Sequence, residues 1–127
     1  MNDPQANNRP TPGRESDQLI VDLKHLYEFA SGDRAHAERF LQLFIEQSEI
    51  DLSNLIASKT SETWRDAAHS LKSGAGGIGA WKVVQAAELA QNEALPLTTE
   101  RCQHHIEILT GRIAEVIAFI KNHRNQG

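Results

Sequence analysis

The sequence predicts an all-α fold, an antiparallel up-down-up-down four-helix bundle with an additional short N-terminal helix. Three observations lead to this expectation. Apolar residues recur at helical spacing in five successive stretches. No stretch combines period-2 alternation with turn signals, so strands are not expected. The breaks between the stretches are short, which favours antiparallel neighbours.

Residues 1–16 are expected to form a flexible tail or linker. They hold three of the four prolines and no Leu, Ile, Val or Phe. Such a segment buries too little apolar surface to offset the entropy lost on ordering. The helical domain is therefore expected over residues 17–124.

Two helices are expected before residue 60. The first is predicted from Gln18 to Ala30, and Asp33 is a suitable N-cap for the second. The core-facing positions are predicted to be Leu19, Leu23, Leu26 and Ala30 in the first helix, and Ala37, Phe40, Leu41, Phe44, Ile45, Ser48, Leu52, Leu55 and Ile56 in the second.

Three more helices are expected after residue 60. Thr60 or Ser61 caps the third, which glycines end near 77–79, Pro96 stops the fourth, and Thr98 or Thr99 caps the fifth. Their apolar stripes are predicted to be Trp64, Ala68, Leu71, Ala75 and Ile78; then Ala80, Val83, Val84, Ala87, Ala90, Gln91 and Ala94; and finally Cys102, Ile106, Leu109, Ile113, Val116, Ile117 and Ile120.

Composition limits the classes of function. The chain has 127 residues, enough for one domain, and a net charge of −4, which argues against a general nucleic-acid binder. Its single cysteine, Cys102, cannot form an intramolecular disulfide, and no apolar run is long enough to cross a membrane. No metal site is expected, because the adjacent His104 and His105 point about 100° apart on a helix. Zinc bound through Cys102 and His105, at positions i and i+3, is the alternative. A cytoplasmic protein is expected.

The most informative segment runs from His69 to Gly79. It holds a histidine, a lysine one turn later and four glycines among its last six residues. Glycine inside a helix costs about 1 kcal/mol relative to alanine, so this helix gives up stability for room beside the imidazole. His69 points roughly 140° away from Trp64 of the apolar stripe. The residues on its side of the helix are Arg65, Lys72, Ser73 and Gly76. An ordinary solvated surface histidine is the alternative interpretation.

This segment resembles the phosphoacceptor motif of histidine-containing phosphotransfer (HPt) domains, where an apolar residue, a lysine, small residues and a closing glycine come after the histidine. The matching positions are His69, Leu71, Lys72, Gly76 and Gly79. Ser73 departs from the pattern, since many members have glycine there, but serine is also small. The similarity extends over roughly residues 17–123.

The resemblance implies that His69 accepts a phosphoryl group from an aspartate of one receiver domain and passes it to another. Lys72 can neutralise the phosphoryl oxygens. Gln91 aligns with a Gln or Glu of the family and would orient the His69 ring; a glutamine at the edge of the apolar stripe is the alternative. The residues expected to dock the receiver are Arg65, Ser73, Gly76 and Gly79. The receiver would bring the Mg²⁺, so no cofactor is expected on this chain.

The chain is not expected to be an enzyme, since it lacks the glycine-rich nucleotide boxes of a histidine kinase. The expected partners are receiver domains of hybrid sensor kinases and response regulators, with no nucleic acid and no membrane, and a monomer is expected. Two alternatives stay open. One is a phosphotransfer region of a larger hybrid or chemotaxis kinase. The other is a helical adaptor that docks receivers without being phosphorylated.

Overall fold

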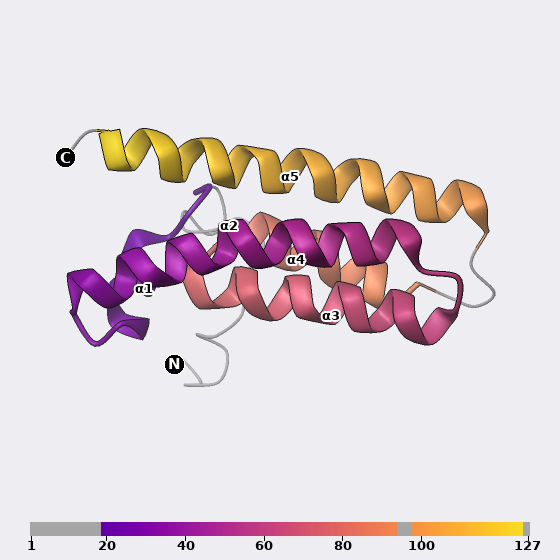
Figure 1. Cartoon of the computed structure of the whole chain (residues 1–127), viewed down its shortest axis with the longest axis horizontal. Helices are drawn as coiled ribbons and strands as arrows, with labels where there is room; N and C mark the ends of the chain where they lie inside the picture. Colours follow the sequence, from indigo (N-terminus) through magenta and orange to yellow (C-terminus); the bar gives the residue numbers. More distant parts are fainter. Residues whose placement is uncertain (1–18, 94–97, 126–127) are drawn as a thin grey trace, which may run out of the picture.

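A computed structural model describes residues 19–93 and 98–125 of the chain, and this part contains five α-helices and no strand. Their bounds are α1 (Leu23–Phe29), α2 (Arg34–Ala57), α3 (Ser61–Ile78), α4 (Trp81–Gln91) and α5 (Thr99–Asn125). Helices α2 to α5 alternate in direction along the bundle, and α1 packs at one end (Figure 1). The predicted fold class is confirmed.

Helix α3 holds a central position in the bundle, because it packs against α2 on one side and α4 on the other. Helix α5 closes the bundle by packing on both α2 and α4. No helix of the described residues is long and apolar enough to span a membrane. The predicted tail, residues 1–16, lies outside the described residues.

Helix α1 is shorter than predicted. It begins at Leu23, because the Asp22 side chain accepts the backbone N–H of His25 at 3.2 Å and so acts as the N-cap. Residues 19–22 are not helical, and Leu19 is 44% exposed, so its predicted core position is wrong. Asp22 is held in place from a distant part of the sequence, since its N–H donates to the Gly79 carbonyl at 2.9 Å. Gln18, the predicted start, lies outside the described residues.

Helix α2 begins at the predicted cap, where Asp33 accepts the His36 N–H at 3.1 Å. Its buried positions have a 4-3-4-3-4 spacing that runs through Ala37, Leu41, Phe44, Ser48, Asp51 and Leu55. This spacing places Asp51 among the buried residues of α2, which was not predicted from the sequence. Ile56 comes one residue after the last buried position, Leu55, and is 59% exposed, so its predicted core position is wrong.

Helix α3 agrees with the prediction at both ends and along its stripe. Thr60 and Thr63 form a capping box at the start. Gly79 adopts a left-handed conformation with φ +74° and ends the helix. All five predicted stripe residues, Trp64, Ala68, Leu71, Ala75 and Ile78, are buried.

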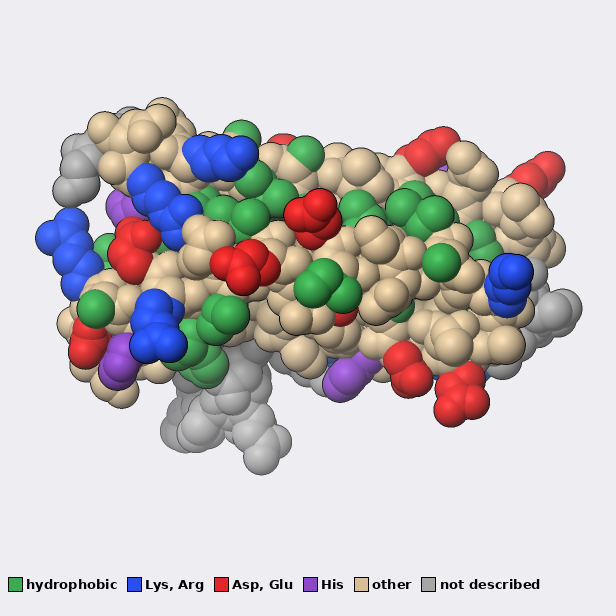
Figure 2. Space-filling view, viewed as in Figure 1, with side chains coloured by type: hydrophobic (Ala, Val, Ile, Leu, Met, Phe, Trp, Pro, Cys, Tyr) green, Lys and Arg blue, Asp and Glu red, His purple; other side chains and the backbone are tan. Residues whose placement is uncertain are grey.

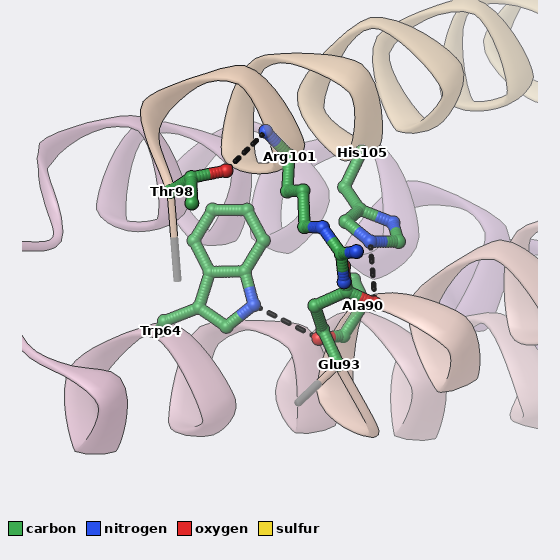
Figure 3. Close-up of polar contacts among 6 residues, drawn as sticks. All are labelled: Trp64, Ala90, Glu93, Thr98, Arg101 and His105. Carbon is green, nitrogen blue, oxygen red and sulfur yellow. Dashed lines mark hydrogen bonds and ion pairs between the residues drawn. The ribbon is translucent and has the colours of Figure 1, made fainter. Parts of the chain in front are cut away.

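Helices α4 and α5 meet at the end of the bundle that Figure 3 shows in detail. Thr98 caps α5 by accepting the Arg101 N–H at 3.2 Å. The predicted stripe of α5 is buried at Leu109, Ile113, Val116 and Ile120 and half-buried at Cys102, Ile106 and Ile117. In α4, Val83, Ala87 and Ala90 are buried, whereas Gln91 is half-buried. Ala94 and Pro96 lie outside the described residues.

A polar cluster ties three helices together at this end. The buried Trp64 indole donates to the Ala90 carbonyl at 2.9 Å, which fixes α3 against α4. Glu93, just after α4, accepts from the Arg101 guanidinium at 2.8 Å and lies 3.6 Å from His105 Nε2 (Figure 3). The hydrogen bond from Arg101, aided by the charges of Arg101 and His105, lowers the pKa of Glu93 below its ordinary value of 4.5.

The Glu93 contacts predict a small acid-dependent term in the stability of the protein. The folded-state pKa lies below the unfolded value, so the stabilisation is complete above pH 4.5 and is lost as the pH falls through the folded-state pKa. We expect Glu93→Gln to lower the free energy of unfolding at pH 7 and to lose that difference in more acidic solution. Denaturant unfolding of both proteins between about pH 7 and about pH 3 measures this; a pH-independent difference would contradict it.

Candidate functional site around His69

His69 lies near the middle of α3 on the face turned away from the buried stripe, and its side chain is exposed. Its ring nitrogen Nδ1 lies 3.3 Å from the Gln91 side-chain nitrogen on α4. The structure therefore brings together two residues 22 positions apart, as was expected of Gln91 from the sequence. Since Nδ1 is engaged, Nε2 is the ring nitrogen left open to an incoming group.

Lys72 lies one turn after His69 and is held toward α4. Its ammonium forms an ion pair with Glu88 at 3.0 Å. Glu88 precedes Gln91 by three residues, as His69 precedes Lys72. Because α3 and α4 are antiparallel, the His69–Gln91 and Lys72–Glu88 contacts lie next to each other, about one turn apart along the two helices. The sequence did not single out Glu88, because only the packing of α4 on α3 shows which residue faces Lys72.

The positions outside the buried stripe that follow His69 along α3 hold little bulk, apart from Lys72. Arg65, Ser73 and Gly74 are exposed and Gly76 is half-buried. A Cβ atom built on Gly74 or Gly76 would meet nothing within 4 Å, so open space lies beside both. On the helical wheel, Ser73 lies about 40° from His69 toward α2 and Lys72 about 60° toward α4.

Gly79 does not belong to this face, which corrects its prediction as a docking residue. It is buried, and a Cβ on it would lie 2.8 Å from the Asp22 Cβ and 2.9 Å from the Asp22 carbonyl oxygen. Its positive φ and this close approach both require glycine. Gly79 ends α3 and receives the segment before α1, so its place in the motif has a structural reason.

An apolar groove of about 340 Å³ between α2 and α3 borders the same face. Its lining includes the apolar side chains of Phe29, Phe40, Leu43 and Phe44 and the small residues Ser73 and Gly74. Phe29 and Leu43 are each 56% exposed. Figure 2 shows hydrophobic side chains at the surface near α1 and the adjoining part of α2. The groove depends on which helices become neighbours, and the sequence did not predict it.

A buried carboxylate lies beneath the groove. Asp51 of α2 is only 4% exposed, and it accepts from Ser70 Oγ at 2.8 Å and from the Gln47 amide at 3.0 Å. Ser70 comes directly after His69, so this bond links the histidine's helix to α2. This contact was not predicted from the sequence, because an aspartate within a helix is typical of a surface position.

His25 is half-buried and ties α1 to the end of α3. Its Nε2–H donates to the Gly76 carbonyl at 2.9 Å, and its ring meets Trp81 edge-on at 4.7 Å. This contact uses the backbone of Gly76 and leaves the open space beside its Cα untouched. Among the described residues, no three His, Cys, Asp or Glu side chains gather as a metal site would require.

A sequence model of the family described as "Hpt domain" matches residues 39–120, more than half of the chain. The chain belongs to the Hpt domain family. The match includes α3, α4 and the contacts of His69 and Lys72 with α4. No curated protein and no solved structure matches the chain. Membership of the Hpt family implies histidine phosphotransfer in phosphorelays and interaction with receiver domains.

Alanine substitutions at the two ends of the last turn of α3, at Gly76 and at Gly79, are expected to have opposite effects on stability. Gly76→Ala meets open space in a helix interior and should stabilise the protein by up to about 1 kcal/mol. Gly79→Ala must adopt φ +74° against the Asp22 backbone and should destabilise it by more than about 2 kcal/mol. Urea unfolding of both variants measures the difference. Equal stabilities would contradict the separate roles assigned to these glycines.

Proposed function

We propose that His69 carries the phosphoryl group in a multistep His–Asp relay, taking it from a receiver aspartate and passing it to another. The observation that carries the proposal is an exposed imidazole held at Nδ1 by Gln91, with Nε2 open and little bulk beside it. Buried or crowded histidines do not permit a second active site to approach in this way.

In the proposed transfer, the lone pair of His69 Nε2 attacks the phosphorus of an aspartyl phosphate. The N–P bond forms as the P–O bond to the aspartate breaks, and the aspartate leaves as a carboxylate. Nε2 holds a lone pair when the neutral ring carries its proton on Nδ1. The ring keeps this proton as the N–P bond forms. The Gln91 amide, turned so that its oxygen faces Nδ1, can accept from Nδ1–H both before and after the transfer.

The cation of Lys72 is proposed to stabilise negative charge on the phosphoryl oxygens. Phosphoryl transfer depends mainly on positioning and charge stabilisation, and a lysine ammonium offers three N–H donors. Lys72 is off the buried stripe, and its side chain is 29% exposed. It can therefore turn toward His69 without disturbing the core.

The receiver is proposed to dock over His69 and the groove between α2 and α3. Ser73 and Gly76 leave room for its aspartate to approach Nε2, and Arg65 lies on the same face. The exposed rings and aliphatic side chains of the groove, Phe29 and Leu43 among them, would bury apolar surface of the receiver. The receiver's own acidic site would supply Mg²⁺.

In this role the chain is a phosphoryl carrier rather than an enzyme with its own nucleotide. We propose that it acts in the cytoplasm, as a monomer, between hybrid sensor kinases and response regulators. A position within a larger hybrid or chemotaxis-type kinase would use the same site. The alternative of a docking adaptor without phosphorylation makes no use of the Gln91 contact or of the nearby Lys72.

His69→Gln should abolish acid-labile labelling by a phosphorylated receiver and leave the helical circular-dichroism signal unchanged, because the side chain is exposed and outside the core. His104→Gln is the matched control, since His104 is an exposed histidine of α5. Labelling of the control at the wild-type level is expected. Label that persists on the His69→Gln protein would exclude His69 as the acceptor.

Gly76→Gln should give a folded protein that binds and accepts poorly from its receiver. The added side chain enters open space, so the bundle tolerates it, yet it stands beside the imidazole, where in-line transfer tolerates only about 1 Å of misplacement. Gly111→Gln on α5, which also enters open space, is the matched control. Receiver affinity and transfer rate are to be measured for both. Wild-type values for Gly76→Gln would refute the docking surface.

A further inference from the structure

The ion pair between Lys72 and Glu88 sets the charge available at the proposed site. The ammonium that would stabilise a phosphoryl group on His69 is already 3.0 Å from a carboxylate. Both side chains are partly exposed, at 29% and 38%, so the pair can open without unpacking the helices. The sequence around His69 gives no sign of this partner, because Glu88 belongs to α4.

The antiparallel packing of α3 and α4 sets the distance of Glu88 from the proposed reaction. His69 contacts Gln91, and Lys72 contacts Glu88 about one helical turn away. Three residues of helix rise by about 4.5 Å, so the Glu88 carboxylate lies about one turn from the imidazole along the helix axis. Lys72 therefore lies between two anionic positions, the Glu88 carboxylate and the phosphoryl group on His69.

We propose that Glu88 is a positioning residue that competes with the phosphoryl group for Lys72. In the unphosphorylated protein, Glu88 holds the Lys72 ammonium between α3 and α4. When His69 is phosphorylated, the ammonium is shared between the carboxylate and the phosphoryl oxygens, which carry more negative charge. This inference rests on the proposed function of His69 and Lys72 and adds a residue that opposes them.

The competition suits a carrier that must both accept and release. A lysine with no counter-ion would stabilise the phosphorylated form fully and favour its retention. A lysine that is also paired with Glu88 stabilises the phosphoryl group less strongly. Less electrostatic stabilisation of the phosphorylated form is therefore lost when the phosphoryl group leaves. Partly exposed ion pairs contribute little each, which keeps the bias small and the transfer reversible.

The test uses phosphoramidate, a small anionic donor that needs no receiver. His69 Nε2 attacks its phosphorus, ammonia leaves, and the ring keeps its Nδ1 proton, so atoms and charge balance. The rate of formation of phosphohistidine is measured by ³¹P NMR in wild type, Glu88→Gln, Lys72→Ala and the double variant. Glu107→Gln, which makes the same charge change at an exposed position of α5, is the matched control. Circular dichroism verifies the fold of each protein.

We expect Glu88→Gln to accelerate phosphorylation about two- to five-fold, the range that the loss of one exposed ion pair allows. Lys72→Ala should slow it, and the double variant should match Lys72→Ala, because the proposed competition requires the Lys72 ammonium. Glu107→Gln should match wild type.

Three results would overturn the competition: a Glu88→Gln rate equal to wild type, a slower Glu88→Gln rate, or an equal acceleration in the Lys72→Ala background. The last would mean that Glu88 repels the donor directly. Failure of the proposed function has a different signature. In that case wild type itself would take up no phosphoryl group on His69, from phosphoramidate or from phosphorylated receivers.

Discussion

The close packing of α3 against α4 is the constraint on which the site depends. Both helices face the bundle interior with small residues, among them Ala68 and Ala75 on α3 and Ala87 and Ala90 on α4, all fully buried. The Trp64 indole then fixes the register by donating to the Ala90 carbonyl at 2.9 Å. With the register fixed, His69 meets Gln91, and Lys72 meets Glu88.

Small residues serve two purposes on the two faces of α3. Alanines inside let the neighbouring helices come close, which brings side chains of α4 within reach of the imidazole. Outside, Gly76 keeps the space beside His69 open, and Gly74 adds no side chain where it lines the groove toward α2. Alanine at these outer positions would favour the helix more, so glycine there fits a surface kept clear for a partner. Gly79 is a separate case, because its positive φ ends the helix.

Local rules were enough to predict much of the fold from the sequence. The caps at Asp33 and Thr60 and the stop at Gly79 arise from side-chain and backbone chemistry within a few residues. The buried stripe of α3 comes from the helical period alone, which also placed His69 on the opposite face. These rules need no knowledge of which helices become neighbours.

The features that the sequence did not predict depend on tertiary neighbours. Residues 19–22 of the predicted first helix are not helical, because the Asp22 backbone N–H pairs with the Gly79 carbonyl, far along the chain. Gly79 was predicted to belong to the docking face, yet the Asp22 backbone lies against it. Glu88 has the sequence context of a surface charge, because its partner Lys72 is on another helix. The groove between α2 and α3 likewise exists only once both helices are packed.

Central to the proposed function is that Gln91 holds Nδ1 of His69 and leaves Nε2 as the reacting atom. The most direct measurement is ¹⁵N and ³¹P NMR of the phosphorylated protein labelled with ¹⁵N-histidine, which identifies the nitrogen bonded to phosphorus. We predict phosphorus on Nε2 of His69, with Nδ1 still coupled to the Gln91 amide. Phosphorus on Nδ1 would contradict this role of Gln91, because that atom could react only after the contact with Gln91 had been broken.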